Sequence, residues 1–307
     1  MPEKPSKLTV ISKIGHKLRK PEYIFQPSRI WRGLLSAGAG ETREAYLPWG
    51  EYIRVKAGDV IGNSILKLGV YELAVSEVLW RLLDEGESFI DVGGNIGYMT
   101  SLMSAKTGSQ GRGMAFEPHP EIFARLQTNV GNRKGVEVFQ CALGRSGGKL
   151  MLLEPDAFSG NEGTARLARE ANKLTDGIEV SVLKLDDLIA DDASIGVMKV
   201  DVEGAELEVF QGADRLLRSH QIRDIVFEDF GDFPSACVVF LRERGYSIYR
   251  ISKGFTRVRY WDPSSPSAKD DGLPWEPVNY AATVDVTRLA ERLRPRGWQV
   301  LMGKRSI

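Results

Sequence analysis

The chain has 307 residues, 42% of them apolar and 27% charged, and its 41 basic and 41 acidic side chains give a formal net charge of zero. This composition is typical of a folded globular protein and excludes a fibrous or wholly disordered chain. Neutrality argues against a general nucleic-acid binder, which is usually basic. The charge is distributed unevenly along the chain: residues 1–35 carry a net charge of +6, residues 288–307 a net charge of +5, and the residues between them a net charge of −11.

Cysteine and hydropathy patterns predict a soluble protein in a reducing, cytoplasmic setting. Cys141 and Cys237 are the only cysteines, which excludes a disulfide framework and a paired-cysteine metal site. The N-terminus lacks the continuous apolar segment of a secretory signal, and no run of about 18 apolar residues predicts a spanning helix. The length fits one large domain with additions, or two small domains.

The first 84 residues show no regular alternation of elements. Residues 1–45 are basic and interrupted by prolines, which predicts a loosely held N-terminal arm with one helix near 8–20. Residues 47–70 mix short apolar stretches with four glycines and predict short strands and turns. Residues 72–84 place apolar side chains at helical spacing, so we expect residues 46–84 to pack on the core.

From residue 85 to 254, predicted strands and helices alternate. The strands are 88–92, 113–117, 136–141, 195–201 and 224–229, and the helices are 95–106, 120–132, 204–218 and 234–244. Repeated strand–helix units imply a mostly parallel sheet with helices on both faces. Because crossovers between parallel strands are right-handed, we expect a doubly wound α/β domain.

Two stretches interrupt this alternation. Residues 145–190 predict an insertion, with a hairpin of 148–153 and 178–183 that carries a polar loop at 154–175. Residues 255–283 are rich in proline and serine and predict a long loop, so that 255–307 would comprise a loop, a strand and a basic tail. Insertions at strand ends often contact substrates, although a solvated loop explains them equally well.

A glycine motif between the first predicted strand and its helix indicates a cofactor site. The segment Asp91-Val92-Gly93-Gly94-Asn95-Ile96-Gly97 reads D-x-G-x-N-x-G, which departs from the dinucleotide pattern G-x-G-x-x-G. Asp91 would repel the pyrophosphate that a dinucleotide places at this helix end. S-adenosylmethionine carries an ammonium and a sulfonium there instead, which suits a carboxylate.

The ends of the next two strands complete the predicted cofactor site. Glu117 ends the second strand, where a carboxylate can accept hydrogen bonds from both ribose hydroxyls. Cys141 and Ala142 end the third strand, where adenine would lie. We interpret Cys141 as a small apolar wall rather than a nucleophile.

The fourth strand ends in an acidic segment, Lys199-Val200-Asp201-Val202-Glu203-Gly204-Ala205-Glu206. Ligands of open α/β sheets bind at such carboxyl ends. Asp201 and Glu203 alternate with valines, so both would face one side if the strand persists. Glu206 falls in the first turn of the next helix, where capping is as good an explanation as catalysis.

With these segments in view, the chain resembles the FkbM family of S-adenosylmethionine-dependent methyltransferases over roughly residues 58–250. The resemblance rests on the following stretches: 58–75 (GDVIGNSILKLGVYELAV), 89–102 (FIDVGGNIGYMTSL), 115–130 (AFEPHPEIFARLQTNV), 185–188 (LDDL), 197–213 (VMKVDVEGAELEVFQGA) and 279–293 (NYAATVDVTRLAERL). Gly94 is a departure, because the family more often has alanine at this position.

The resemblance implies a class I methyltransferase fold, a Rossmann-like seven-stranded sheet whose last strand is antiparallel, and methyl transfer to a hydroxyl of a sugar, glycan or natural product. By match of motif, Asp91, Gly93, Gly94, Asn95 and Gly97 would hold the methionine part, and Glu117 the ribose. Tyr71 and Glu72 would also lie near the cofactor, together with Asp201. No Asn/Asp-Pro-Pro-aromatic motif follows the fourth strand, which favours hydroxyl over amino acceptors.

An alcohol acceptor needs a general base. The candidates are Asp201, Glu203 and Glu228, which ends the fifth strand, and then His119, which is first a loop residue. These acids with Glu206 could suit Mg²⁺, but no histidines accompany them and the resemblance requires no metal, so we predict none. For the substrate we expect contacts from Lys199 and from the polar loop at Asn161.

Two alternatives remain at this point: an NAD-dependent oxidoreductase or epimerase, and a non-catalytic protein that retains the cofactor fold. The expected partner is a small-molecule or glycan hydroxyl, with no nucleic acid, and homo-oligomerisation is left open. The basic ends are interpreted as solvated arms, or else as a site for an anionic substrate or a membrane-linked glycolipid.

Overall fold

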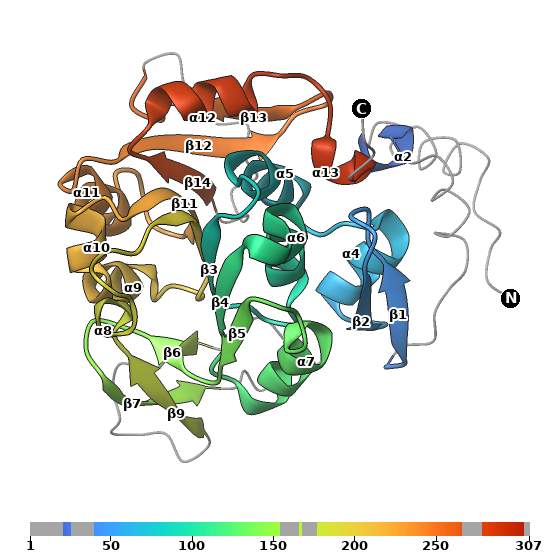
Figure 1. The fold of residues 1–307 in the computed structure, drawn as a ribbon, viewed down its shortest axis with the longest axis horizontal. Helices are drawn as coiled ribbons and strands as arrows, with labels where there is room; N and C mark the ends of the chain where they lie inside the picture. The colour runs from blue at the N-terminus through green and yellow to red at the C-terminus, as the bar shows by residue number, and fades with distance from the viewer. Residues whose placement is uncertain (1–20, 26–39, 154–165, 168–176, 266–277, 304–307) are drawn as a thin grey trace, which may run out of the picture.

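The computed structural model describes residues 21–25, 40–153, 166–167, 177–265 and 278–303. A central sheet of eight strands, in the order β13-β12-β14-β11-β10-β3-β4-β5, is covered by helices on both faces (Figure 1). Its strands are β3 (Ser88–Val92), β4 (Arg112–Phe116), β5 (Val136–Phe139), β10 (Ile195–Val200), β11 (Ile222–Asp229), β12 (Ser247–Lys253), β13 (Val258–Trp261) and β14 (Val278–Thr283). Five strands from β5 to β11 are parallel, and β14 is antiparallel to both neighbours.

This sheet confirms the predicted doubly wound α/β fold. The seven strands from β12 to β5 include the antiparallel last strand β14, which inserts between β11 and β12, and β13 adds an eighth strand at the edge. The helices are α5 (Leu73–Leu82), α6 (Tyr98–Thr107), α7 (Pro120–Val130), α8 (Leu185–Leu188), α9 (Glu206–Gly212), α10 (Asp214–Arg218), α11 (Ala236–Arg242), α12 (Val286–Leu293) and α13 (Gln299–Met302), with a 3-10 turn at Gly108–Gln110.

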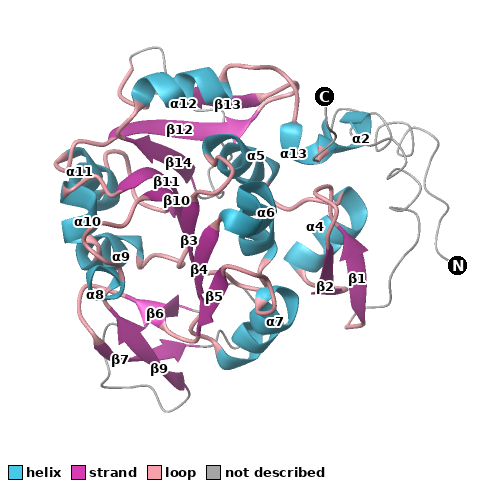
Figure 2. Ribbon diagram, in the orientation of Figure 1, coloured by secondary structure: helices cyan, strands magenta, loops and turns pink. Residues whose placement is uncertain are grey.

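The two faces of the sheet bury separate apolar cores. Helices α5, α6 and α7 cover one face and α8 to α11 cover the other (Figure 2). Successive residues of a strand point to opposite faces, so Phe89 of β3 lies in the first core and Ile90 in the second. By the same alternation Asp91 points to the α6 side. Among the described helices, none is long and apolar enough to cross a bilayer.

The N-terminal part differs from the prediction. Residues 60–68, expected as turns, form helix α4 (Val60–Leu68), next to a two-stranded sheet of β1 (Thr42–Tyr46) and β2 (Tyr52–Lys56). Asp59 caps α4 by accepting a hydrogen bond from the Gly62 amide. Gly62 is a packing glycine, because a Cβ there would lie 2.0 Å from the Lys56 carbonyl oxygen. The strand β1 also begins inside the predicted arm, as does the short helix α2 (Pro21–Phe25). The helix predicted near 8–20 lies outside the described residues.

The insertion contains the predicted hairpin. Strand β7 (Gly148–Leu153) pairs antiparallel with β9 (Gly177–Leu183), and short strands β6 (Ala142–Leu143) and β8 (Arg166–Leu167) complete a second sheet. The predicted helix 204–218 divides at Ala213 into α9 and α10. The fourth strand ends at Val200, one residue earlier than predicted.

The C-terminal part is more ordered than the predicted loop and basic tail. Strands β13 and β14 lie inside 255–283, so the long-loop prediction was wrong there. Helix α12 is not a solvated arm. Arg288 forms ion pairs with Asp84 at 2.7 Å and with buried Asp224 at 3.2 Å, and Arg292 pairs with Asp84 at 2.7 Å. The basic residues of this helix therefore hold it against the acidic body.

Candidate active site

A cavity of about 240 Å³ opens at the carboxyl ends of the parallel strands. Twelve of the side chains or glycines proposed from sequence line it: Tyr71, Glu72, Gly93, Gly94, Asn95, Glu117, Cys141, Ala142, Lys199, Asp201, Glu203 and Glu228. Asp91 and Gly97 do not line it, and Asn161 lies outside the described residues. Residues far apart in the sequence thus meet here because parallel strands all end at one edge of the sheet.

The glycine motif makes the tight turn that the sequence predicted. Gly93 has φ +77°, and a Cβ there would lie 1.9 Å from the carbonyl oxygen of Asp201. The amides of Gly93 and Gly94 both donate to the Phe116 carbonyl, at 3.0 and 2.9 Å. Gly97, with φ +87°, is the N-cap of α6. Only a residue without a side chain fits at Gly93, since both the backbone angle and the space exclude a Cβ.

Asp91 lies behind the cavity wall rather than in it. It is fully buried, and one carboxylate oxygen accepts a hydrogen bond from the Thr100 hydroxyl at 2.5 Å. The other oxygen has no hydrogen-bond partner among the described residues and lies 3.7 Å from Lys199 Nζ. Burial raises the pKa of Asp91, although Lys199 opposes this shift. The geometry makes Asp91 an anchor for α6 and Lys199.

Lys199 connects two carboxylates. Its ammonium donates to the Gly93 carbonyl at 3.1 Å and lies 3.2 Å from an Asp201 oxygen. The side chain is only 5% exposed. Burial alone lowers the pKa of this lysine, but the carboxylates of Asp201, Asp91 and Glu72 together raise it above its ordinary value. Lys199 is therefore charged and holds the glycine turn next to the acidic segment.

Glu117 is positioned by two backbone amides. One oxygen accepts from the Asn95 amide and the other from the His119 amide, both at 3.0 Å. Burial raises the pKa of Glu117 to about 7. Since a carboxylate offers about four acceptor positions, two remain for hydroxyl groups in the cavity. His119 itself is the buried N-cap residue of α7 and does not line the cavity, which agrees with its interpretation as a loop residue.

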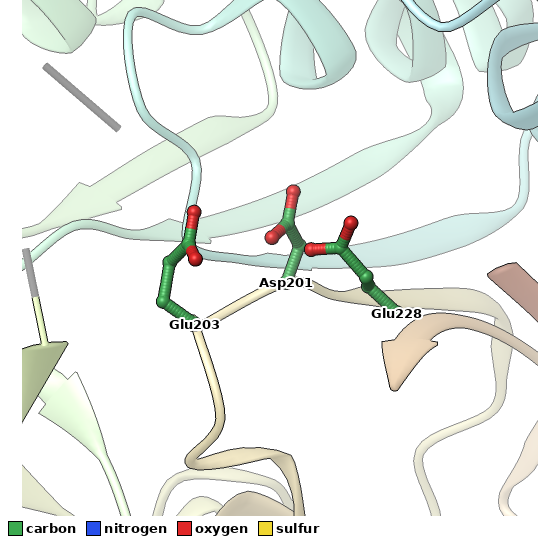
Figure 3. Close-up of side chains that lie close together, drawn as sticks. All are labelled: Asp201, Glu203 and Glu228. Atoms are coloured by element: carbon green, nitrogen blue, oxygen red, sulfur yellow. The ribbon is translucent and has the colours of Figure 1, made fainter. Parts of the chain in front are cut away.

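Three carboxylates converge at one end of the cavity (Figure 3). Oxygens of Asp201, Glu203 and Glu228 lie within 4.8 Å of one another. The expected reason for this, continued strand alternation, was wrong: β10 has ended, and Glu203 adopts φ +54° in the following turn. Glu228 comes from β11, which pairs directly with β10.

Burial and the neighbouring carboxylates change the ionisation of Glu228. Burial, followed by the neighbouring carboxylates of Asp201 and Glu72, raises the pKa of Glu228 to about 9. Burial and Asp201 likewise raise the pKa of Glu72 to about 7. Like charges this close cannot all ionise at neutral pH. Glu228 is therefore the carboxyl group of the cluster that holds a proton most readily.

Glu206 accepts hydrogen bonds from the backbone of the acidic segment. One of its oxygens accepts hydrogen bonds from the amides of Val202 and Gly204, both at 3.1 Å. This supports the capping explanation over a catalytic one. Glu206 is also absent from the group of carboxylates close enough to share an ion.

Backbone strain is concentrated around this cavity. Among the described residues, four non-glycine residues have positive φ, and three of them, Glu72, Asn95 and Glu203, line the cavity. Such conformations cost about 1–3 kcal/mol each and persist where the surrounding structure enforces them. Their concentration at one cavity is typical of a functional site.

The sequence did not indicate several apolar wall residues. Val60 and Ile61 come from α4, which was predicted as turns, and Leu152 comes from β7 of the inserted hairpin. Ile122 of α7 and Phe116 of β4 complete this wall. Their only sequence signal is apolar character, which does not distinguish a ligand wall from a core.

Comparison with known proteins places the site in a family. The model of the methyltransferase FkbM domain matches residues 91–248. The chain is 32% identical to Methyltransferase 1 of Beauveria bassiana, over 53% of this chain and 73% of that protein. It is 30% identical to the hexuronic acid methyltransferase AglP of Haloferax volcanii, over 51% and 58%. It is 32% identical to the 31-O-demethyl-FK506 methyltransferase FkbM of Streptomyces tacrolimicus, over 54% and 75%.

Solved structures of low sequence identity also align. One is a SAM-dependent O-methyltransferase from Thermotoga maritima, with 13% identity and a TM-score of 0.36, covering 81% of this chain and 79% of that one. Another is fibrillarin from Aeropyrum pernix, with 15% identity and a TM-score of 0.37, covering 82% and 86%.

Proposed function

The chain belongs to the FkbM family of methyltransferases and uses S-adenosylmethionine, and on this premise we propose that it methylates a hydroxyl group of a sugar, glycan or natural product. Membership of this family argues against the two alternatives, an NAD-dependent oxidoreductase or epimerase and a non-catalytic protein that retains the cofactor fold. Two relatives support the acceptor class by their names, one a hexuronic acid methyltransferase and one a 31-O-demethyl-FK506 methyltransferase.

The cavity residues fit the cofactor. Glu117 has free acceptor positions for a ribose diol, and Glu72 offers a carboxylate to an ammonium or sulfonium. Lys199 is the only basic side chain among the described residues that line the cavity, and it is already paired with Asp201 and Asp91. An anionic wall of this kind suits a cationic molecule better than a pyrophosphate. When bound, S-adenosylmethionine supplies an activated methyl group.

Catalysis by the chain then consists of positioning and proton removal. The carboxylate cluster would position the acceptor hydroxyl, which accounts for most of the expected acceleration. Asp201 would accept the hydroxyl proton, and S-adenosylmethionine, held by Glu72 and Glu117, would supply the methyl group that the hydroxyl oxygen takes. Protonated Glu228 donates a hydrogen bond within the cluster, and Lys199 fixes the Asp201 carboxylate.

One observation carries this proposal. The neighbouring parallel strands β10 and β11 place Asp201, Glu203 and Glu228 together in the same cavity that contains the glycine motif and Glu117. The groups that we propose to bind the cofactor and to accept the proton therefore lie in one cavity. Methyl transfer to a hydroxyl needs both.

The test is a labelled-methyl assay on neutral sugars, acidic sugars and macrolide alcohols, with wild type and Asp201→Asn. We expect Asp201→Asn to lower kcat by roughly 10²- to 10⁴-fold, as for loss of a general base, while cofactor affinity is retained. Asp187→Asn, at an exposed aspartate of α8, is the matched control and should behave as wild type. Full turnover of Asp201→Asn would refute the assigned role.

A further inference from the structure

A second cavity, of about 610 Å³, adjoins the candidate active site. The two cavities share the lining residues Leu143 and Glu203. One wall of the second cavity comes from the turn 144–147 between β6 and β7 and the first residues of β7. Another wall comes from the segment 203–211, which includes the start of α9. Because Glu203 belongs to the carboxylate cluster, a molecule in this cavity lies next to the proposed proton acceptor.

The turn 144–147 is held in place by its surroundings. The Gly144 amide donates to the Leu183 carbonyl at 3.0 Å. The Gly144 carbonyl packs so closely on α9 that a Cβ at Gly212 would lie 2.1 Å from its oxygen. After the turn, Gly148 pairs with Val182 in the β7–β9 hairpin. The backbone at Arg145 is therefore preorganised, which lowers the entropic cost of binding a ligand.

The charges of this cavity are distributed unequally between its walls. Arg145 is exposed, and its guanidinium forms no hydrogen bond or ion pair with the part of the chain that the structure describes. Lys149, the second residue of β7, is already paired with Glu179 at 2.7 Å. Glu203 and Glu208 contribute carboxylates to the other wall. The cavity thus has one guanidinium on one wall and hydrogen-bond acceptors on the other.

These two walls suit different groups of one molecule. A guanidinium binds carboxylate and phosphate groups through paired hydrogen bonds. Carboxylates accept hydrogen bonds from hydroxyl groups, and the amide of Gln211 can both donate and accept. A ligand with several hydroxyls and one anionic group satisfies both walls, whereas a purely apolar ligand satisfies neither.

We propose that this second cavity is the acceptor subsite, and that it binds a sugar carrying a carboxylate or phosphate, with Arg145 holding the anionic group. The inference rests on the proposed function, since it takes the adjoining cavity as the site of methyl transfer. It names the acceptor class more narrowly than that function does.

Binding can be measured without turnover. Full-length protein saturated with S-adenosylhomocysteine is titrated calorimetrically with para-nitrophenyl glucoside, para-nitrophenyl glucuronide and glucose phosphate. We expect the two anionic probes to bind roughly ten- to hundredfold more tightly than the neutral glucoside, the range expected for a charge-assisted hydrogen bond. A preference between the two anionic probes distinguishes a carboxylate from a phosphate ligand. Arg145→Glu should abolish the anionic preference and leave affinity for S-adenosylhomocysteine unchanged.

The matched control is Arg112→Glu, at an exposed arginine that begins β4, at the amino end of the strand. It should retain the preference for anionic probes. Equal affinity for neutral and anionic probes, no binding of the anionic probes, or wild-type binding by Arg145→Glu would each overturn the subsite. Anionic binding without methylation would instead refute the proposed function, and methylation of neutral sugars alone would refute only the subsite.

Discussion

The ammonium nitrogen of Lys199 lies 3.2 Å from a carboxylate oxygen of Asp201 and holds that residue beside the glycine turn. The same nitrogen is 3.7 Å from a carboxylate oxygen of Asp91. Asp91 is buried, and this oxygen has no hydrogen-bond partner among the described residues. A single cation thus compensates a structural carboxylate behind the cavity and the proposed proton acceptor within it. This relationship couples the stability of the site to its chemistry.

Replacing Lys199 should therefore destabilise the protein as well as inactivate it. Lys199→Met leaves Asp91 as a buried charge without a cation, and breaking such a pair costs about 3–5 kcal/mol. Urea denaturation should show this loss in the free energy of unfolding. Adding Asp91→Asn to Lys199→Met should restore part of it, since the uncompensated charge is then gone. Strictly additive losses in the double variant would contradict the coupling.

Stability should fall as the pH rises through the titration range of Glu228. Burial, then Asp201, raises the pKa of Glu228 from 4.5 to about 9. The native state therefore keeps a proton that the unfolded chain releases. The stabilisation is complete below pH 4.5 and is lost as the pH approaches about 9. Glu228→Gln, which mimics the neutral acid, should flatten this decline in chemical denaturation measured across that range.

The control for this measurement is Glu121→Gln, at an exposed residue of α7. It should show the wild-type dependence on pH. If Glu228→Gln and the wild type lose stability in parallel between these pH values, Glu228 is not protonated in the native state.

Alanine substitution at two adjacent glycines should have a large effect at one position and a small effect at the other. At Gly93 a Cβ would lie 1.9 Å from the Asp201 carbonyl and φ is +77°, so Gly93→Ala should displace the acidic segment and weaken cofactor binding. At Gly94 the nearest contact of a Cβ is 3.5 Å, to Leu126, and φ is ordinary. Gly94→Ala should change the free energy of unfolding by no more than about 1 kcal/mol. Thermal melts with and without S-adenosylhomocysteine measure the stability and the cofactor binding of each variant. Equal loss of binding in the two variants would be inconsistent with the turn geometry.

The carboxylate cluster should function without a divalent cation. Asp201, Glu203 and Glu228 are close enough to share an ion. However, Lys199 pairs with Asp201, and the raised pKa of Glu228 leaves it protonated at neutral pH, so the cluster already carries reduced negative charge. We expect protein dialysed against EDTA to keep its turnover, with heat-treated protein as the blank. Loss of activity that added Mg²⁺ restores would show that the cluster is a metal site.

Local patterns predicted the parts of this protein whose structure depends on neighbours in sequence. Strand β3, with its following glycine turn, and the β7–β9 hairpin appear where the sequence predicted them. Helix α4 was missed because Gly62 looked like a turn residue. Its role is instead close packing on the Lys56 carbonyl, a contact that no local pattern encodes. The arginines of α12 looked like a solvated tail for the same reason, since their partner Asp84 lies about two hundred residues away in sequence.

The sequence by itself determined the fold class, the glycine turn, the acidic residues at the strand ends and, through its motifs, the family. Tertiary structure decided which of these groups meet. It placed Asp91 behind the cavity against Thr100 and Lys199, bonded Glu206 to backbone amides, and brought Arg145 and Glu203 to one cavity. The physical reason is that propensity and periodicity act within a few residues, whereas burial, ion pairing and proton sharing depend on neighbours that only the packed sheet and its insertion bring together.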